Sequence, residues 1–344
     1  MSEGRSLVEL PKVDLHVHLE GSIRPATLAE LAERNHVPLP SGLQDGRYTF
    51  RDFPHFIEQW VACLHCLRRP EDYRRIAREF CEDEAAQGVR YAEPSFSLPE
   101  HGPRVGDWEA PLEAVLEGLA EGSAAFGVRC GVIVDVVRGL DIVLSERAAA
   151  VAVAHRDRGV VAVGLGGSER FVPELYMAIF AEARTGGLHT VAHAGESAGA
   201  GSVRSALDAL GAERIGHGIR ILEDAELVAE VRERRVALEV CPTSNVMTRV
   251  VPRIEAHPLP RLLEAGLAVT LGSDDPAMFG SPLAGEYEVA RSVFGLSDGS
   301  LADLARTGVR ASFAGEATKA AIEGEIEGWL RSSAASPARG AAPG

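Results

Sequence analysis

Eight short β-rich runs alternate with helical stretches along the chain, and this alternation restricts the possible folds more than any other feature. The runs are Val13–Leu19, Val89–Phe96, Arg129–Val137, Val160–Leu165, Thr190–Ala194, Ile215–Ile219, Val236–Cys241 and Ala268–Ser273. They are nearly continuous in apolar residues, which is typical of parallel strands buried on both faces. Eight β–α repeats predict an α/β fold, the (β/α)8 TIM barrel. A six-stranded doubly wound sheet is the rival fold, but it would leave two of the runs unexplained.

The chain between the first and second runs is much longer than the other connections. Residues 25–88 hold about three helical stretches, which is more than a single crossover helix needs. We therefore expect a helical insertion near the barrel mouth, within one barrel domain of residues 1–331. Four apolar side chains of this insertion fall at helical spacing, namely Phe53, Phe56, Trp60 and Leu64. They either pack on the barrel or cover a substrate. We expect the small, polar segment 332–344 to be a disordered tail.

The charge balance excludes several classes of partner. The chain has 35 basic and 50 acidic residues, for a net charge of −15, which argues against nucleic acid or an anionic membrane surface. No apolar run approaches the ~20 residues that span a bilayer, and the N-terminus lacks the apolar segment of a signal peptide. The five cysteines are scattered and do not form a disulfide framework. We therefore expect a cytoplasmic protein with a small-molecule substrate. The sequence does not predict an oligomeric state.

Histidines and carboxylates gather where the predicted strands end. In (β/α)8 barrels the residues that do chemistry lie at the C-terminal ends of the strands. The first run ends in His16 and His18, and strand alternation places both imidazoles on the same, inward face. Later strand ends carry His193 with Glu196, then His217, and finally Asp274 with Asp275. Four of the eleven histidines and three carboxylates therefore converge on one end of the predicted barrel.

This constellation predicts a mononuclear zinc site with a separate acid. Zn²⁺ is a borderline ion that accepts nitrogen and oxygen ligands, and the predicted ligands are His16, His18, His193 and Asp274. A water at an open position would have its pKa lowered toward ~7. Glu196 can give and take a proton, while His217 and Asp275 can orient and deprotonate the water. One metal is favoured over two, because neither of the two lysines, Lys12 and Lys319, lies at the fourth strand end to bridge a second ion.

Five motifs, PKVDLHVHLEGS, VAHAGE, RIGHG, VCPTSN and LGSDDP, resemble the adenosine deaminase family of the amidohydrolase superfamily. They run in the family's order from residue 11 to residue 276. The resemblance implies the same zinc ligands, protonation of purine N1 by Glu196, and a hydroxide held by His217 and Asp275. It also implies that the backbone of Gly167 contacts purine N3. The implied reaction is hydrolytic deamination at C6, which gives a 6-oxopurine and ammonia.

The substrate within this family is less constrained. Adenosine deaminases commonly carry an aspartate that meets the ribose 5′-hydroxyl where this chain has Glu20, and they read A-G-D-E where it has Gly166–Glu169. The motif A-M-F-G at residues 277–280 looks more like the adenine and aminodeoxyfutalosine deaminase branches, whereas RIGHG is closer to nucleoside users. We expect a 6-aminopurine nucleoside, either adenosine or a 5′-modified form such as 6-amino-6-deoxyfutalosine. The predicted substrate-binding residues are His18, Glu20, Gly167 and Asp275.

Three other interpretations stay open at this point. Free adenine is the alternative substrate, and a non-catalytic barrel that binds a purine or a metal is the alternative class of protein. A binding module would need none of the three residues Glu196, His217 and Asp275, so their joint presence favours an aminohydrolase. A mononuclear zinc hydrolase of another amide-like bond is a third possibility.

Overall fold

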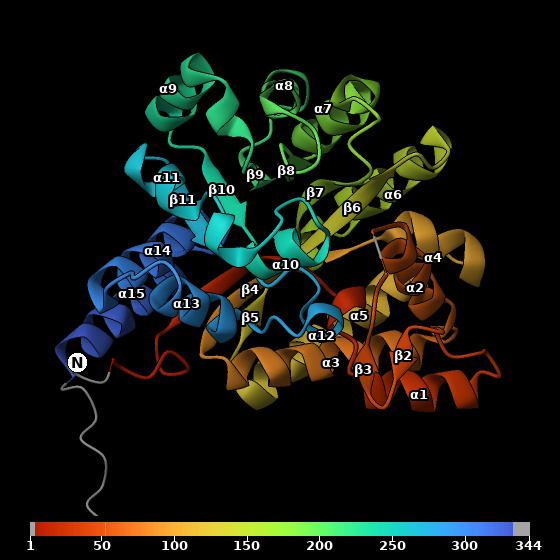
Figure 1. Ribbon diagram of the computed structural model, residues 1–344. Helices are drawn as coiled ribbons and strands as arrows, with labels where there is room; N and C mark the ends of the chain where they lie inside the picture. Colours follow the sequence, from red (N-terminus) through yellow and green to blue (C-terminus); the bar gives the residue numbers. More distant parts are fainter. Residues whose placement is uncertain (1–3, 52, 333–344) are drawn as a thin grey trace, which may run out of the picture.

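The computed structural model describes residues 4–51 and 53–332, and parallel strands surrounded by helices form its centre (Figure 1). Eight strands follow one another in chain order: β1 (Lys12–His18), β4 (Val89–Phe96), β6 (Val132–Arg138), β7 (Val160–Gly167), β8 (His189–Ala194), β9 (Arg214–His217), β10 (Ala237–Val240) and β11 (Ala268–Leu271). Every neighbouring pair on this path is parallel. The predicted TIM barrel is therefore confirmed.

The first and last strands meet at their carboxyl ends. Val17 and Asp274 form an isolated parallel bridge there. The backbone N–H of His18 donates to the carbonyl of Asp274 at 2.7 Å, and the N–H of Asp274 donates to the carbonyl of His16 at 2.8 Å. Residues from the two ends of the sequence are therefore joined at one point of the barrel rim.

One predicted strand is interrupted. The run Arg129–Val137 divides at Gly131 into β6 and the short β5 (Arg129–Cys130), and both pair with β4. A Cβ at Gly131 would lie 2.6 Å from a methyl group of Val161. The backbone needs glycine for this close approach, which a pattern of apolar residues does not reveal.

The long connection between β1 and β4 contains the three helices expected there and one element that was not expected. Its elements are η1 (Glu20–Ser22), α1 (Pro25–Arg34), β2 (Leu43–Gln44), β3 (Arg47–Tyr48), α2 (Phe53–His65) and α3 (Pro70–Ala86). The strands β2 and β3 form an antiparallel hairpin. Asp45 and Gly46 make its turn with φ of 49° and 74°. An Asp-Gly pair with both φ positive is typical of a two-residue hairpin turn.

The other helices lie around the strands and at the barrel mouth (Figure 1). Their bounds are α4 (Leu98–Val105), α5 (Ala110–Phe126), α6 (Ile142–Ala154), α7 (Met177–Thr185), α8 (Ala200–Ser205), α9 (Ala225–Arg234), α10 (Pro242–Met247), α11 (Leu259–Glu264), α12 (Pro276–Phe279), α13 (Leu283–Ser292), α14 (Asp298–Ala311) and α15 (Glu316–Arg331). Short turns are η2 (Arg156–Arg158), η3 (Pro173–Tyr176), η4 (Ala206–Leu210), η5 (Ile221–Glu223) and η6 (Ile254–Ala256). A Cβ at Gly118 of α5 would lie 2.2 Å from the carbonyl oxygen of Arg74, so glycine lets α5 pack closely on α3.

The two ends of the described chain lie near each other, where the indole N–H of Trp329 in α15 donates to the carbonyl of Ser6 at 3.0 Å. Most of the tail predicted at 332–344 lies outside the described residues, which end at Ser332. Among the helices of residues 4–51 and 53–332, none combines the length and the apolar character needed to cross a membrane.

Candidate active site and metal centre

The carboxyl ends of the strands bring the predicted metal and catalytic residues together. Six of them line one cavity of about 340 Å³: His18, His193, Glu196, His217, Asp274 and Asp275. His16 lies beside the cavity, with its ring centroid 4.5 Å from that of His193 and 4.6 Å from that of His217. Gly167, predicted to contact the purine, lines the same cavity.

Two of these residues hold a strained backbone. His217 and Asp274 each have a φ of 61°, in the left-handed region that non-glycine residues seldom occupy. Each stands directly at or just after a strand end, where the chain leaves the barrel wall. Such strain persists where surrounding structure enforces it, and it is common at functional sites. The turn of the backbone directs both side chains toward the cavity that they line.

The ring nitrogens of three histidines and one carboxylate converge. Nε2 of His18 lies 3.3 Å from Nε2 of His193 and 3.4 Å from Oδ1 of Asp274. Nε2 of His16 lies 3.9 Å from the same Asp274 oxygen. The atoms of His16, His18 and His193 can share one ion, and Asp274 belongs to neighbouring groups of possible ligands that include His16 or His18.

Hydrogen bonds on the outer side of two rings leave their inner nitrogens available. Nδ1 of His16 lies 3.0 Å from Oε2 of Glu239, and Nδ1 of His193 lies 3.2 Å from the carbonyl of Leu165. Both contacts suit an Nδ1–H donor, which places the lone pair on Nε2. Nε2 of His16 is buried and finds no hydrogen-bond partner within the described part of the chain. A divalent metal ion fits this donor set, because it would satisfy the orphaned nitrogen and the converging lone pairs.

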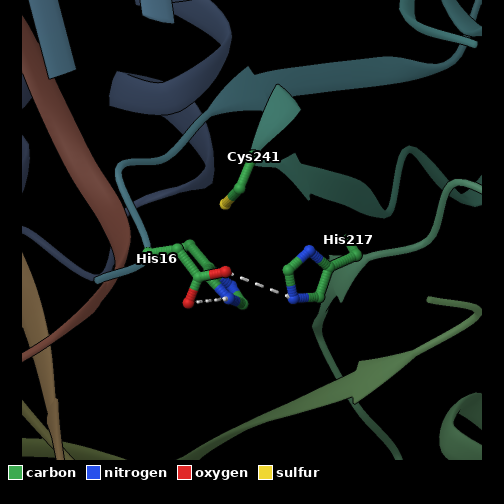
Figure 2. A group of neighbouring side chains, drawn as sticks. His16, His217 and Cys241 are labelled. Atoms are coloured by element: carbon green, nitrogen blue, oxygen red, sulfur yellow. Dashed lines mark ion pairs between the residues drawn. The ribbon is translucent and has the colours of Figure 1, made fainter. Parts of the chain in front are cut away.

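Cys241 is a neighbour of this cluster that the sequence analysis did not include among the site residues. It follows β10, and Figure 2 shows its thiol directed toward the space between His16 and His217. Its sulfur can share an ion with His16, His217 and Asp274. Burial raises the pKa of the Cys241 thiol well above its ordinary value, which favours the neutral form in the metal-free protein.

Glu196 and Asp275 are two further acids that line the cavity, and Asp275 is buried whereas Glu196 is partly exposed. Burial raises the pKa of the Glu196 carboxyl, whose Oε2 lies 3.8 Å from Nε2 of His217. Burial, and then the charge of Asp274, raise the pKa of Asp275 well above its ordinary value. The indole N–H of Trp60, in α2, donates to Oδ1 of Asp275 at 3.1 Å. Sequence reasoning placed Trp60 over the barrel but did not find this bond.

Glu20 is the predicted substrate-binding residue that the structure places behind the cavity wall. Its Oε1 accepts hydrogen bonds from the backbone N–H of Ser97 at 2.8 Å and, at 3.0 Å, pairs with Nε2 of His101. Its Oε2 is buried and has no hydrogen-bond partner among residues 4–51 and 53–332. Glu20 does not line the cavity, whereas the adjacent Ser97 does.

Apolar side chains from two parts of the chain line much of the rest of the cavity, which is also lined by the charged residues Glu100, Asp135, Arg138 and Arg170. Phe56, Ile57, Val61 and Phe279 contribute from α2 and α12, and Val137, Leu140 and Phe171 contribute from the ends of β6 and β7. Of the apolar residues predicted to pack on the barrel or cover a substrate, Phe56 and Trp60 line the cavity and Leu64 does not. That α2 covers a substrate stays a prediction. The histidines and carboxylates at one end of the cavity suit a heteroaromatic base, and the apolar side chains suit a less polar group attached to that base.

Comparison with known proteins agrees with this geometry. The sequence profile of the adenosine deaminase family matches residues 11–329. An aminodeoxyfutalosine deaminase from Streptomyces coelicolor is 42% identical over 334 residues, covering 94% of this chain and 86% of the relative. The crystal structure of an adenine deaminase from Arthrobacter aurescens superposes with a TM-score of 0.88 at 33% identity, covering 94% of this chain and 99% of that one. A zinc-bound amidohydrolase structure from Burkhoderia ambifaria gives 0.87 at 28% identity, covering 94% and 92%.

Fold and site together define a hydrolase built on a TIM barrel, with a cluster of possible metal ligands at its cavity. The chain belongs to the adenosine deaminase family, as its resemblance in sequence implied. It is a deaminase-type hydrolase of that family.

Proposed function

We propose that the protein catalyses the zinc-dependent hydrolytic deamination of a 6-aminopurine nucleoside at C6, which releases ammonia and leaves a 6-oxopurine. The observation that carries this proposal is that possible metal ligands and the carboxyl group of Glu196 face one cavity. Glu196 belongs to none of the groups of possible ligands, which supports a role for it beyond metal binding.

His16, His18, His193 and Asp274 would hold one zinc ion, as their converging atoms allow. A bound zinc ion supplies an activated water at neutral pH and acts as a Lewis acid. The zinc-bound amidohydrolase with the same fold supports this choice of metal. The outer bonds to Glu239 and Leu165 keep two of the rings in the tautomer that binding requires.

Glu196 acts as the proton donor to purine N1. Burial raises the pKa of its carboxyl above the ordinary value, which favours the protonated form that a proton donor needs. Protonation of N1 weakens the aromatic ring and makes C6 a better electrophile. Asp275 and His217 orient the attacking water and receive its proton, and the backbone of Gly167 contacts N3. The proton taken from the water then passes to the C6 amino group, and the C6–N bond breaks to release ammonia. The hydroxyl group at C6 gives its proton back to Glu196 as the C6 carbonyl forms.

The size and lining of the cavity favour a nucleoside over the free base. The apolar wall that includes Phe56, Phe171 and Phe279 leaves room beyond the catalytic end, where a 5′-modified ribose would lie. Glu20 would meet the 5′ end through its unpaired Oε2 if the wall at Ser97 opened slightly. The engagement of Oε1 inside the protein favours the second candidate, free adenine, which the Arthrobacter relative is named for.

A panel of substrates tests the proposal. The zinc-loaded protein is assayed for ammonia release from adenosine, 5′-deoxyadenosine, methylthioadenosine, 6-amino-6-deoxyfutalosine, adenine, AMP and cytidine. We expect one 5′-form of a 6-aminopurine nucleoside to give the highest kcat/KM. A preference for adenine would favour the second candidate. Silence across the panel with zinc bound would contradict the aminohydrolase assignment.

The proton donor is tested by Glu196→Gln. We expect turnover to fall by roughly 10²–10⁴-fold, because the acid is lost while the four ligands remain. Zinc content, measured by atomic spectroscopy, should stay at the wild-type level. Wild-type turnover in this variant would show that another group protonates the ring.

A further inference from the structure

One carboxylate just outside the cavity organises the turn that carries Glu196. Glu169, which follows β7, accepts hydrogen bonds from four consecutive backbone N–H groups, those of Gly195 (2.8 Å), Glu196 (2.9 Å), Ser197 (2.7 Å) and Ala198 (3.2 Å). The hydroxyl groups of Ser202 and Ser197 donate to it at 2.5 Å and 3.3 Å. Both carboxylate oxygens are used.

The turn has little other support for its backbone donors. It leaves β8 through Gly195, whose φ of 67° is left-handed, and it ends where α8 begins. Backbone N–H groups that face the protein interior are costly to leave unpaired. Glu169 is itself 8% exposed, so its carboxylate replaces water as their acceptor. Burial alone would raise the pKa of Glu169, but the bonds from Ser202 and the turn hold that pKa below its ordinary value.

A neighbouring arginine fixes the two strand ends on which this arrangement rests. Arg138, at the end of β6, is buried, and its Nη2 donates to the carbonyl of His193 at 2.8 Å. Its Nη1 donates to the carbonyl of Gly167 at 3.4 Å. The ends of β7 and β8 are therefore held at a set separation, and Glu169 spans from one to the other. The position of the Glu196 side chain thus depends on Glu169 through the backbone.

We propose that Glu169 is a positioning residue for deamination, which fixes the turn 195–198 so that the Glu196 carboxyl meets the substrate at the distance that proton transfer requires. This rests on the proposed function of Glu196. Proton transfer needs heavy atoms within hydrogen-bond reach, and a displacement of about 1 Å can cost roughly 100-fold in rate. Glu169 does not line the cavity, so its effect on turnover would pass through Glu196.

The main test is Glu169→Gln. An amide keeps one acceptor oxygen, but its NH₂ group would face N–H donors of the turn. We expect kcat to fall roughly 100-fold with KM changed by less than about threefold, because the predicted metal ligands and the residues that line the cavity are unaltered. The matched control is Glu174→Gln, an exposed carboxylate in the same connection, which should leave kcat unchanged. Ser202→Ala removes one donor and leaves the carboxylate, so it should lower kcat by a smaller factor.

A double-mutant cycle separates positioning from a general structural role. In the Glu196→Gln background, Glu169→Gln should cost less than about threefold, because residues that act as a unit are not additive. An equal loss in both backgrounds would overturn the proposal, as would wild-type kcat in Glu169→Gln.

Amide hydrogen exchange supplies a measurement that does not depend on activity. Amides 195–198 should be protected in the wild type and should exchange at least tenfold faster in Glu169→Gln, but not in Glu174→Gln. If the wild type releases no ammonia from any purine while this exchange pattern is found, the proposed function fails and the anchoring of the turn stands. Unchanged exchange in Glu169→Gln would show that the turn is held by other contacts.

Discussion

Two buried carboxylates support opposite halves of the site, and they do so by different means. Glu239, on β10, acts inside the barrel through side chains: it bonds Nδ1 of His16 at 3.0 Å and pairs with Nε of Arg214. Glu169, outside the barrel, acts on the backbone of the turn that carries Glu196. Glu239 supports His16 and so the predicted metal ligands, which we call the metal half of the site. Glu169 supports the turn with Glu196, which we call the proton-donor half.

The interior support is a chain of charges along the barrel. Nη2 of Arg214 donates to Oε2 of Glu93 at 2.5 Å, and Oε1 of Glu93 accepts from the backbone N–H of Phe313 at 2.6 Å. Although burial alone would lower it, the charges of Glu93 and Glu239 raise the pKa of Arg214, so the guanidinium stays charged. Burial would raise the pKa of Glu239, but Arg214 and His16 lower it. Burial raises the pKa of Glu93 above its ordinary value, although Arg214 acts to lower it, so the charged form is favoured for Arg214 and Glu239 but less so for Glu93.

Glu239 and Glu169 act differently because a different part of the chain needs support at each position. Strand pairing already fixes the backbone in the barrel, where Glu239 lies opposite Gly216, and a Cβ at Gly216 would lie 2.6 Å from Cε1 of His16. Only the orientation of the His16 ring remains to be set, and a side chain can set it. In the turn after β8 the described residues form no strand pairing with the backbone N–H groups, and Glu169 accepts from these groups instead. Arg220 bonds the carbonyls of Gly195 and Ser197 on the other side of the turn. We therefore expect interior changes to affect stability and metal affinity, and turn changes to affect rate.

The largest expected effect is on stability, in Arg214→Met. This change leaves Glu93 and Glu239 buried without their shared cation, and breaking a buried pair in this way costs about 3–5 kcal/mol. Urea unfolding of the apo protein measures the free energy of unfolding. The control is Arg234→Met, which removes an exposed i,i+4 pair with Glu230 and should cost about 0.5 kcal/mol or less. If Arg214→Met lowered the free energy of unfolding by less than about 1 kcal/mol, the contrast drawn between Glu239 and Glu169 would be wrong.

The next effect is on metal affinity, in Glu239→Gln. The amide keeps the shape of the side chain, and Arg214 keeps Glu93, but the charged acceptor that orients His16 is lost. Loss of such an outer partner typically weakens metal binding by about 10–100-fold. Competition with a chromophoric chelator measures the zinc affinity.

Exposed Glu233→Gln on α9 serves as the matched control and should bind zinc like the wild type. Glu169→Gln should also bind zinc with wild-type affinity. This variant tests whether Glu239 alone supports the metal half of the site. Equal losses of affinity in Glu239→Gln and Glu169→Gln would mean that the two halves form one unit.

The convergence of the predicted ligands could be expected from the sequence because two simple rules locate these residues. The period-2 alternation of a strand places His16 and His18 on one face, and the carboxyl-end rule selects His193, His217 and Asp274. The supports were missed, although a signal existed for the interior set. Glu93 and Glu239 are charged residues inside otherwise apolar strand runs, which is unfavourable unless they are paired.

No comparable signal marks the turn or the insertion. That Glu169 meets four backbone donors depends on the path of an irregular segment, which no periodicity specifies. The Asp45-Gly46 hairpin does have a sequence signature, but two-residue strands are too short to show alternation. The contact of Trp60 with Asp275 depends on how α2 packs over the barrel, which is a tertiary property.

The smallest effect is expected in Trp60→Phe, which removes the hydrogen bond that α2 gives to the site. The change removes the N–H that donates to Oδ1 of Asp275 at 3.1 Å and keeps an aromatic ring in the cavity wall. A single hydrogen bond contributes about 0.5–1.5 kcal/mol, so kcat/KM should fall by roughly three- to tenfold. Zinc affinity and the free energy of unfolding should stay at wild-type values, since neither carboxylate is touched. Trp108→Phe, outside the cavity, is the control. A loss of zinc affinity in Trp60→Phe would show that α2 supports the metal half as well, and the division of the site between two carboxylates would then be incomplete.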